Sequence, residues 1–124
     1  MLPWVDLGFA VAGVSGLPQL DGSGSLADGT PGFLQLVDAA PLAPAALYMS
    51  TSSTPTPFKG GKLLPVPVLQ TLILSTHSQG EIPLAWSAWP AGLSGVNLYF
   101  QFAVEDVAAM KGVALSNALG AFVP

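Results

Sequence analysis

The chain has 124 residues, of which 51 % are hydrophobic and only 8 % are charged, and its formal net charge at pH 7 is −4. With three lysines and no arginine, the chain lacks the basic side chains needed to bind a nucleic acid or an anionic membrane surface. A membrane-spanning helix needs about 20 consecutive apolar residues, and the sequence contains no such run. Cysteine is absent, so disulfides and thiolate metal sites are excluded. The length fits a single domain over residues 1–124, which we expect to be part of a larger protein.

The 14 glycines and 12 prolines are spread along the chain and leave room for short strands rather than long helices. Alternation of apolar and polar residues between Gly, Pro and Asp turns predicts strands at 4–14, 18–26, 32–37, 45–50, 69–76, 82–88, 96–105 and 113–123. Pro65 and Pro67 favour an edge strand at 62–68. The polar segment 50–57 is predicted to be a mobile loop, and 106–112 one turn of helix before a bend.

Segment 96–105 gives the clearest strand pattern. Leu98, Phe100, Phe102 and Val104 alternate with Tyr99, Gln101 and Ala103, which predicts one face in the core and one mixed face. Eight or nine short strands at regular spacing predict an all-β, antiparallel β-sandwich. We expect an immunoglobulin-like or fibronectin type III-like arrangement, with a jelly roll as the alternative.

The residue types argue against an enzyme. His77 is the single histidine and lies at the start of a polar turn, so we interpret it as solvated rather than as a base for Ser75 or Ser78. The seven carboxylates fall mostly at turns and strand ends, where Asp bonds to its own turn. We therefore assign no catalytic residue.

Oxygen-rich residues follow one another in Asp21-Gly22-Ser23-Gly24-Ser25, with Asp28 close behind. This composition suggests a weak possibility of calcium near Asp21 and Asp28, although the segment lacks the bidentate Glu of an EF-hand and fits a strand equally well. One histidine and no cysteine make a zinc site improbable, and no glycine-rich nucleotide loop is present. No cofactor is expected.

Aromatic side chains are the remaining candidates for a binding site. Trp4, Trp89 and Tyr99, together with Trp86, are candidates for a platform that stacks on sugar rings or for an interface with a protein. The alternative is that Trp86 belongs to the core and Trp89 covers one end of the sandwich.

Ordered motifs run along nearly the whole chain. They are Trp4-x-Asp6-Leu7-Gly8, Gly16-Leu17-Pro18-x-Leu20-x-Gly22-x-Gly24-x-Leu26-x-x-Gly29, Gly60-Gly61-x-Leu63, Leu98-Tyr99-x-Gln101 and Gly112-x-Ala114-Leu115-Ser116-Asn117-Ala118. With them the chain resembles a domain found near the C-termini of secreted and cell-surface proteins of planctomycetes and related bacteria, although 107–111 departs from the pattern. The resemblance implies an extracellular β-sandwich module and brings no established activity and no catalytic residue.

Composition and resemblance together lead to two functional expectations. The first is a noncatalytic structural, adhesion or protein-interaction module at the cell surface, able to associate with a protein partner or with itself, because a charge-poor exterior presents few like-charge penalties. The second is a carbohydrate-binding module that uses Trp4, Trp89 or Tyr99.

Overall fold

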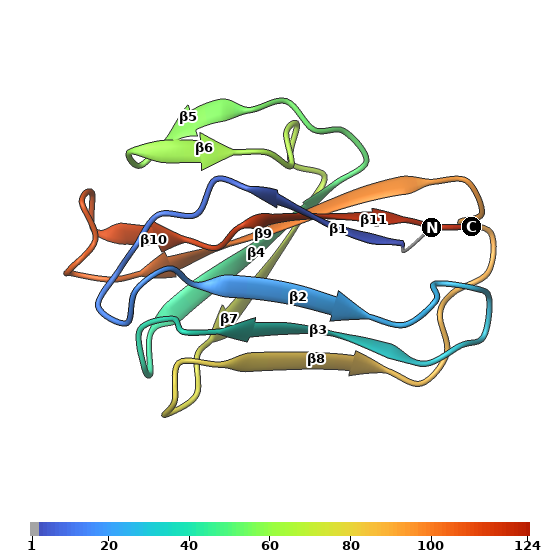
Figure 1. The fold of residues 1–124 in the computed structure, drawn as a ribbon, viewed down its shortest axis with the longest axis horizontal. Helices are drawn as coiled ribbons and strands as arrows, with labels where there is room; N and C mark the ends of the chain where they lie inside the picture. The colour runs from blue at the N-terminus through green and yellow to red at the C-terminus, as the bar shows by residue number, and fades with distance from the viewer. Residues whose placement is uncertain (1–2) are drawn as a thin grey trace.

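The computed structural model describes residues 3–124, which form two antiparallel sheets packed face to face and a short hairpin on the outer side of the larger sheet (Figure 1). The strands are β1 (Trp4–Gly8), β2 (Gln19–Ser23), β3 (Gly32–Val37), β4 (Pro44–Ser50), β5 (Thr56–Phe58), β6 (Gly61–Leu63), β7 (Gln70–Ser75), β8 (Ile82–Trp86), β9 (Asn97–Glu105), β10 (Val113–Leu115) and β11 (Ala118–Phe122).

The larger sheet has the order β1-β11-β9-β4-β7, with β10 also paired to β9, and the smaller sheet has the order β2-β3-β8. β5 and β6 pair only with each other. The predicted all-β antiparallel sandwich is confirmed, with eleven short strands in place of eight or nine. Residues 3–124 contain no helix long and apolar enough to cross a membrane.

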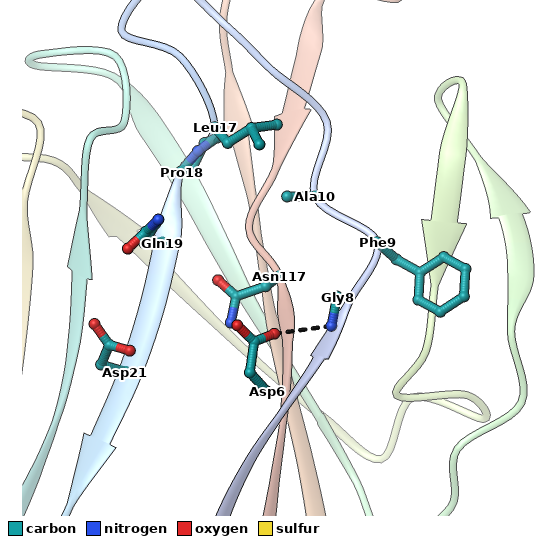
Figure 2. A pocket seen from close by; sticks show the side chains of 9 residues that line it. All are labelled: Asp6, Gly8, Phe9, Ala10, Leu17, Pro18, Gln19, Asp21 and Asn117. Atoms are coloured by element: carbon teal, nitrogen blue, oxygen red, sulfur yellow. Dashed lines mark hydrogen bonds between the residues drawn. The ribbon is translucent and has the colours of Figure 1, made fainter.

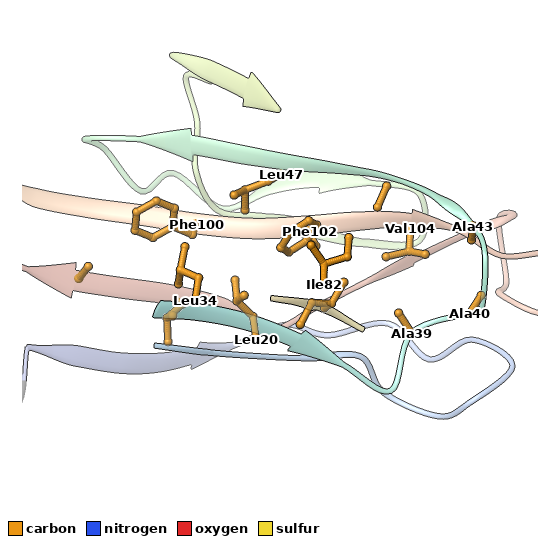
Figure 3. Close-up of a cluster of buried hydrophobic side chains, with 14 of the residues drawn as sticks. Leu20, Leu34, Ala39, Ala40, Ala43, Leu47, Ile82, Phe100, Phe102 and Val104 are labelled. Atoms are coloured by element: carbon orange, nitrogen blue, oxygen red, sulfur yellow. The ribbon is translucent and has the colours of Figure 1, made fainter. Parts of the chain in front are cut away.

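The core lies between the two sheets, as Figure 3 shows. Leu20, Leu34 and Ile82 of the smaller sheet face Leu47 and Phe102 of the larger one, and all five side chains are buried. The apolar face predicted for segment 96–105 is confirmed, because its alternate side chains enter this core. Successive residues of a strand point to opposite faces, so the inward positions are fixed once one of them is buried.

The other face of β9 is also covered, at Gln101, whose side chain is 0 % exposed. Its Oε1 accepts a hydrogen bond from the backbone N of Leu64 at 2.9 Å, and its Nε2 donates to the carbonyl oxygens of Lys62 (3.1 Å) and Ser116 (3.0 Å). The bonds to Lys62 and Leu64 attach the β5–β6 hairpin to the outer side of the larger sheet. The mixed face predicted from the sequence is therefore partly an internal one.

Asn117 joins the two sheets along the side where β1 and β2 run close together. Its Oδ1 accepts from the backbone N of Leu20 at 2.7 Å and its Nδ2 donates to the Leu20 carbonyl at 3.0 Å. The carboxamide thus takes the place of a peptide group from a neighbouring strand. Because both backbone groups of Leu20 are buried, this pairing satisfies a donor and an acceptor that water cannot reach.

The first and last predicted strands are each too long. β1 ends at Gly8, because Gly8 and Phe9 have φ of +79° and +70°, and beyond them only Val11 and Gly13 form isolated bridges. Segment 113–123 is two strands, β10 and β11. They are separated at Ser116, whose Oγ accepts from the Phe102 N and donates to the Asn117 carbonyl.

Two further segment predictions are wrong. Residues 62–68 are not an edge strand: pairing stops at Leu63 and the prolines lie in irregular chain. Segment 106–112 forms turns rather than a helix, because the two carboxylate oxygens of Asp106 accept from the backbone N of Ala108 and of Val14, which fixes a bend. Within the polar connector, 51–55 is exposed, and its end is ordered as β5.

Replacing Asn117 tests the junction between the sheets. Asn117→Ala leaves the buried N–H and C=O of Leu20 unpaired, so we expect the free energy of unfolding to fall by about 2–4 kcal/mol. Urea denaturation followed by intrinsic fluorescence measures the change. The control Asn97→Ala alters an exposed amide on β9 and should change stability by less than about 0.5 kcal/mol. Equal stability of the two variants would show that the pairing contributes nothing.

Candidate functional site

An aromatic cluster occupies one end of the core. The ring centroids of Trp4 and Trp86 are 6.2 Å apart, those of Trp86 and Trp89 5.0 Å, and those of Trp4 and Phe100 6.5 Å. Trp4, at the start of β1, also donates from Nε1 to the Gly24 carbonyl at 2.9 Å. The three indoles are half-buried, so the cluster is continuous with the core and still shows ring surface to solvent.

Two glycines of the smaller sheet make room for these indoles. A Cβ on Gly22 would overlap the six-membered ring of Trp4, and one on Gly32 would lie 2.6 Å from Cζ2 of Trp86. Since real contacts to Cβ atoms are longer than 3.0 Å, Gly22 accepts a side chain only if the indole of Trp4 moves. At Gly32 a Cβ would also overlap the backbone carbonyl oxygen of Ser23, so movement of the Trp86 indole would not be enough. These strand glycines therefore mark close approach of a ring to the backbone.

Trp89 lies in the loop after β8 and covers the end of the sandwich. Its backbone N donates to the Thr30 carbonyl at 2.8 Å, and its carbonyl accepts from the Gly29 N at 2.9 Å. The ring packs on Trp86 and on the core. This placement matches the alternative in which Trp86 belongs to the core and Trp89 closes one end.

Tyr99 does not join this cluster. It packs edge-to-face on Phe122, with centroids 6.3 Å apart and planes at 78°. Tyr99 alternates with Phe100 along β9, so it lies on the outer face of the larger sheet, whereas Phe100 contacts Trp4 on the inner face. Of the candidate aromatics, the structure brings Trp4 and Trp89 together through Trp86 and leaves Tyr99 on the other side of the sheet.

An apolar slot of about 320 Å³ opens beside the cluster, between β7 of the larger sheet and β8 of the smaller one. Its lining is entirely apolar and includes Leu72, Leu84 and Trp86. The Nε1 atoms of Trp86 and Trp89 are buried and have no hydrogen-bond partner among the described residues. A slot of this kind accommodates hydrocarbon and offers no acid, base or nucleophile for chemistry.

A cleft of about 370 Å³ with a lining of mixed polarity lies on the opposite side of the molecule, between β1 and β2 (Figure 2). Figure 2 shows Asp6 projecting from β1 and Asp21 from β2. Asp6 Oδ1 accepts from the Gly8 N at 2.8 Å, and the Asn117 amide at the base of the cleft is already bonded to Leu20. The cleft therefore contains two exposed carboxylates, while the Gly8 N–H and the Asn117 amide beside them already have hydrogen-bond partners.

The residues considered for calcium are in different places. Asp21 is in the middle of β2, whereas Asp28 is exposed in the turn before β3. Hydroxyls of that turn bond within it: Thr30 Oγ1 donates to the Ala27 carbonyl at 2.7 Å and lies 3.2 Å from Ser25 Oγ. Throughout the described part of the chain, no three His, Asp or Glu side chains come together as metal ligands.

His77 is exposed in the turn that follows β7, as the sequence predicts. Its backbone N donates to the Glu81 carbonyl at 2.9 Å, and its carbonyl accepts from Gly80 at 3.0 Å. These bonds belong to the turn between β7 and β8 and give His77 a structural position there.

β7 is the functional candidate that sequence reasoning missed. It pairs with β4 on one side only, and its sequence Gln-Thr-Leu-Ile-Leu-Ser contains no charge. The Ile73 side chain is 77 % exposed, and Leu69 and Leu72 beside it are also exposed. The absence of charge in this segment could have indicated an interaction edge. The sequence pattern instead predicted the edge strand at 62–68, because of its two prolines.

Comparison with known proteins yields no relative: no protein-family model, curated protein or solved structure matches this chain. Function is therefore inferred from the geometry of the chain itself.

Adding one methyl group tests the packing of the cluster. Gly22→Ala places a Cβ inside the Trp4 ring, so the indole must move away and lose its bond to Gly24. We expect a loss of about 1–3 kcal/mol in the free energy of unfolding and a red shift in tryptophan emission. Ser23→Ala, an exposed change on the same strand, is the control. Unchanged emission from Gly22→Ala would contradict this packing.

Proposed function

We propose that the chain is a noncatalytic structural or adhesion module of an extracellular bacterial protein, and that it associates with other protein modules, including copies of itself. The observation that carries this proposal is the free edge of β7, which is uncharged and bordered by exposed apolar side chains. Exposed apolar surface of this kind marks sites of protein interaction.

The backbone of an edge strand supplies the second part of the argument. An edge presents a row of unpaired N–H and C=O groups, which is a template for a strand from another chain. Soluble proteins usually block such an edge with a lysine, a proline or a bulge. β7 has none of these, so its edge is available for pairing.

The order of the strands supports an immunoglobulin-like sandwich in preference to a jelly roll. β3 and β8 pair in one sheet with β2 outside them, and β11, β9, β4 and β7 follow one another in the other. Variable-type immunoglobulin domains likewise divide A, B and E from G, F, C and C′, with a further strand D that the smaller sheet here lacks. Such sandwiches are common as interaction modules, although a fold by itself implies no function.

The extracellular assignment rests on the resemblance to cell-surface domains of planctomycetes, and the positions of the motif residues agree with a structural role. Three of these residues are buried, and their side chains form hydrogen bonds with backbone groups: Gln101, Ser116 and Asn117. Residues used in this way hold loops and sheets together. They are not free to bind a substrate, which supports a module without catalytic activity.

Carbohydrate binding is the second candidate, favoured by the half-buried rings of Trp4 and Trp89 at one end of the sandwich. Their exposed surface is able to stack on the apolar face of a sugar. A glycan array separates the two candidates. Hits that Trp89→Ala abolishes support a sugar site, whereas an empty array leaves protein association as the function.

A lysine on the free edge tests the association. We expect the mass of the unmodified protein, measured by light scattering, to rise with concentration. We expect Ile73→Lys to remain a monomer, because a lysine on an edge strand opposes the addition of another strand. Ser53→Lys, in the exposed connector, adds the same charge elsewhere and should associate like the parent. A parent protein that stays monomeric at high concentration would count against the proposal.

A further inference from the structure

We infer that two copies of this chain pair antiparallel through β7, with the two-fold axis passing beside Ile73, so that the larger sheets join into one continuous sheet. This inference rests on the proposed function, because it names the surface and the partner of that association. It requires that β7, among the strand edges of the molecule, is the one suited to pairing, and that its sequence is complementary to itself.

Every other free edge in residues 3–124 carries a feature that opposes strand addition. β1 contains Asp6 and an irregularity in its pairing, β2 contains Asp21, and β8 contains Pro83. The hairpin contains Pro57 in β5 and Lys62 in β6. The outer side of β10 is already bonded to the chain that follows β1, because Val11 and Leu115 exchange backbone hydrogen bonds of 2.9 and 3.1 Å. Charges, prolines and bulges are the devices that keep edges unpaired, and β7 is a free edge that has none of them.

The register with β4 shows which backbone groups β7 offers. Ser75 lies opposite Pro44, which has no N–H, and the next residue, Thr76, donates from its backbone N to the Ala43 carbonyl at 2.9 Å. Since hydrogen-bonded and non-bonded pairs alternate in an antiparallel ladder, Ser75, Ile73 and Thr71 point their N–H and C=O groups away from β4. These three residues therefore form the hydrogen-bonding side of the free edge.

When the two-fold axis passes beside Ile73, the outward backbone groups of Thr71, Ile73 and Ser75 all meet the partner strand. Ile73 then lies opposite Ile73 of the partner subunit, and Thr71 lies opposite Ser75 of the partner subunit. On the outer face this joins isoleucine to isoleucine and hydroxyl to hydroxyl, with no charge on either strand. Apolar and hydroxyl cross-strand pairs are favourable, whereas like charges would oppose each other, so the uncharged sequence suits a two-fold partner.

The same register also pairs apolar side chains on the inner face of the sheet. Leu72 and Leu74 point toward the smaller sheet, because they lie opposite Leu47 and Ala45 of the core. In the pair, Leu72 faces Leu74 of the partner subunit. Leu72 lines the apolar slot, so the partner strand extends over its open side and removes apolar surface from water.

The size of the contact predicts a weak pair. The five aligned residues 71–75, at about 3.4 Å each, give a strand contact about 17 Å long, and the two sheets are about 10 Å apart. The area covered is then roughly 200 Å² on each copy, well below the roughly 800 Å² per partner of stable complexes. We therefore expect a reversible dimer that forms in concentrated solution or where copies are held close together.

Single cysteines test the register, because the chain has no cysteine of its own. Across the axis the Cα atoms of residue 73 are about 5.5 Å apart, within disulfide range, so Ile73→Cys should form a covalent dimer under mild oxidation. Thr71→Cys is the matched control on the same face, because residue 71 lies about 14 Å along the strand from its own copy. A mixture of Thr71→Cys and Ser75→Cys proteins should cross-link as heterodimers.

Each outcome is decisive. Selective cross-linking of Ile73→Cys, and of the Thr71→Cys and Ser75→Cys mixture, supports the pairing; cross-linking of Thr71→Cys alone, or equally of all variants, overturns it. If light scattering still shows association that Ile73→Lys abolishes, the proposed function stands and this register fails. If the parent protein does not associate at all, both fail. Native mass spectrometry of each oxidised variant gives the readout.

Discussion

Two hydrogen bonds between the Asn117 carboxamide and Leu20 join the two sheets of this sandwich along one side. A cleft of mixed polarity lies there between β1 and β2. On the other side β7 and β8 share no hydrogen bonds, so an apolar slot stays open between them. The proposed interaction surface is therefore on the side where the edge strands of the two sheets share no hydrogen bonds.

Polar residues inside an apolar chain have a common role here. At three places where strand pairing is interrupted, a side chain supplies the missing partner: Gln101 bonds to the hairpin, Ser116 to Phe102, and Thr76 to Ala40 and Ala43. Buried backbone groups must be satisfied in this way, because water does not reach them. The low charge and the many turns of this protein are thus connected, since turns create unpaired groups and neutral amides or hydroxyls satisfy them.

The sequence predicted those features that depend on local pattern. The alternation around Phe102 gave the inward face of β9, and the uncharged alternation around Ile73 gave a strand. The sequence predictions were wrong where contacts between distant parts of the chain determine where a strand ends or which side chains meet. The chain bends at Ser116 and after Asp106 because those side chains bond to distant backbone, and Tyr99 is separated from Trp4 by the thickness of a sheet.

The sequence by itself determined an all-β sandwich without thiol chemistry or a basic surface, because period-two alternation and composition are local properties. Only the tertiary structure decided which strand is an unprotected edge. An edge is defined by the strands that are not beside it, and neighbours in a sheet come from distant parts of the chain. The same reason explains why Trp4 and Trp89 join one cluster through Trp86 while Tyr99 does not, because their positions depend on sheet packing rather than on sequence spacing.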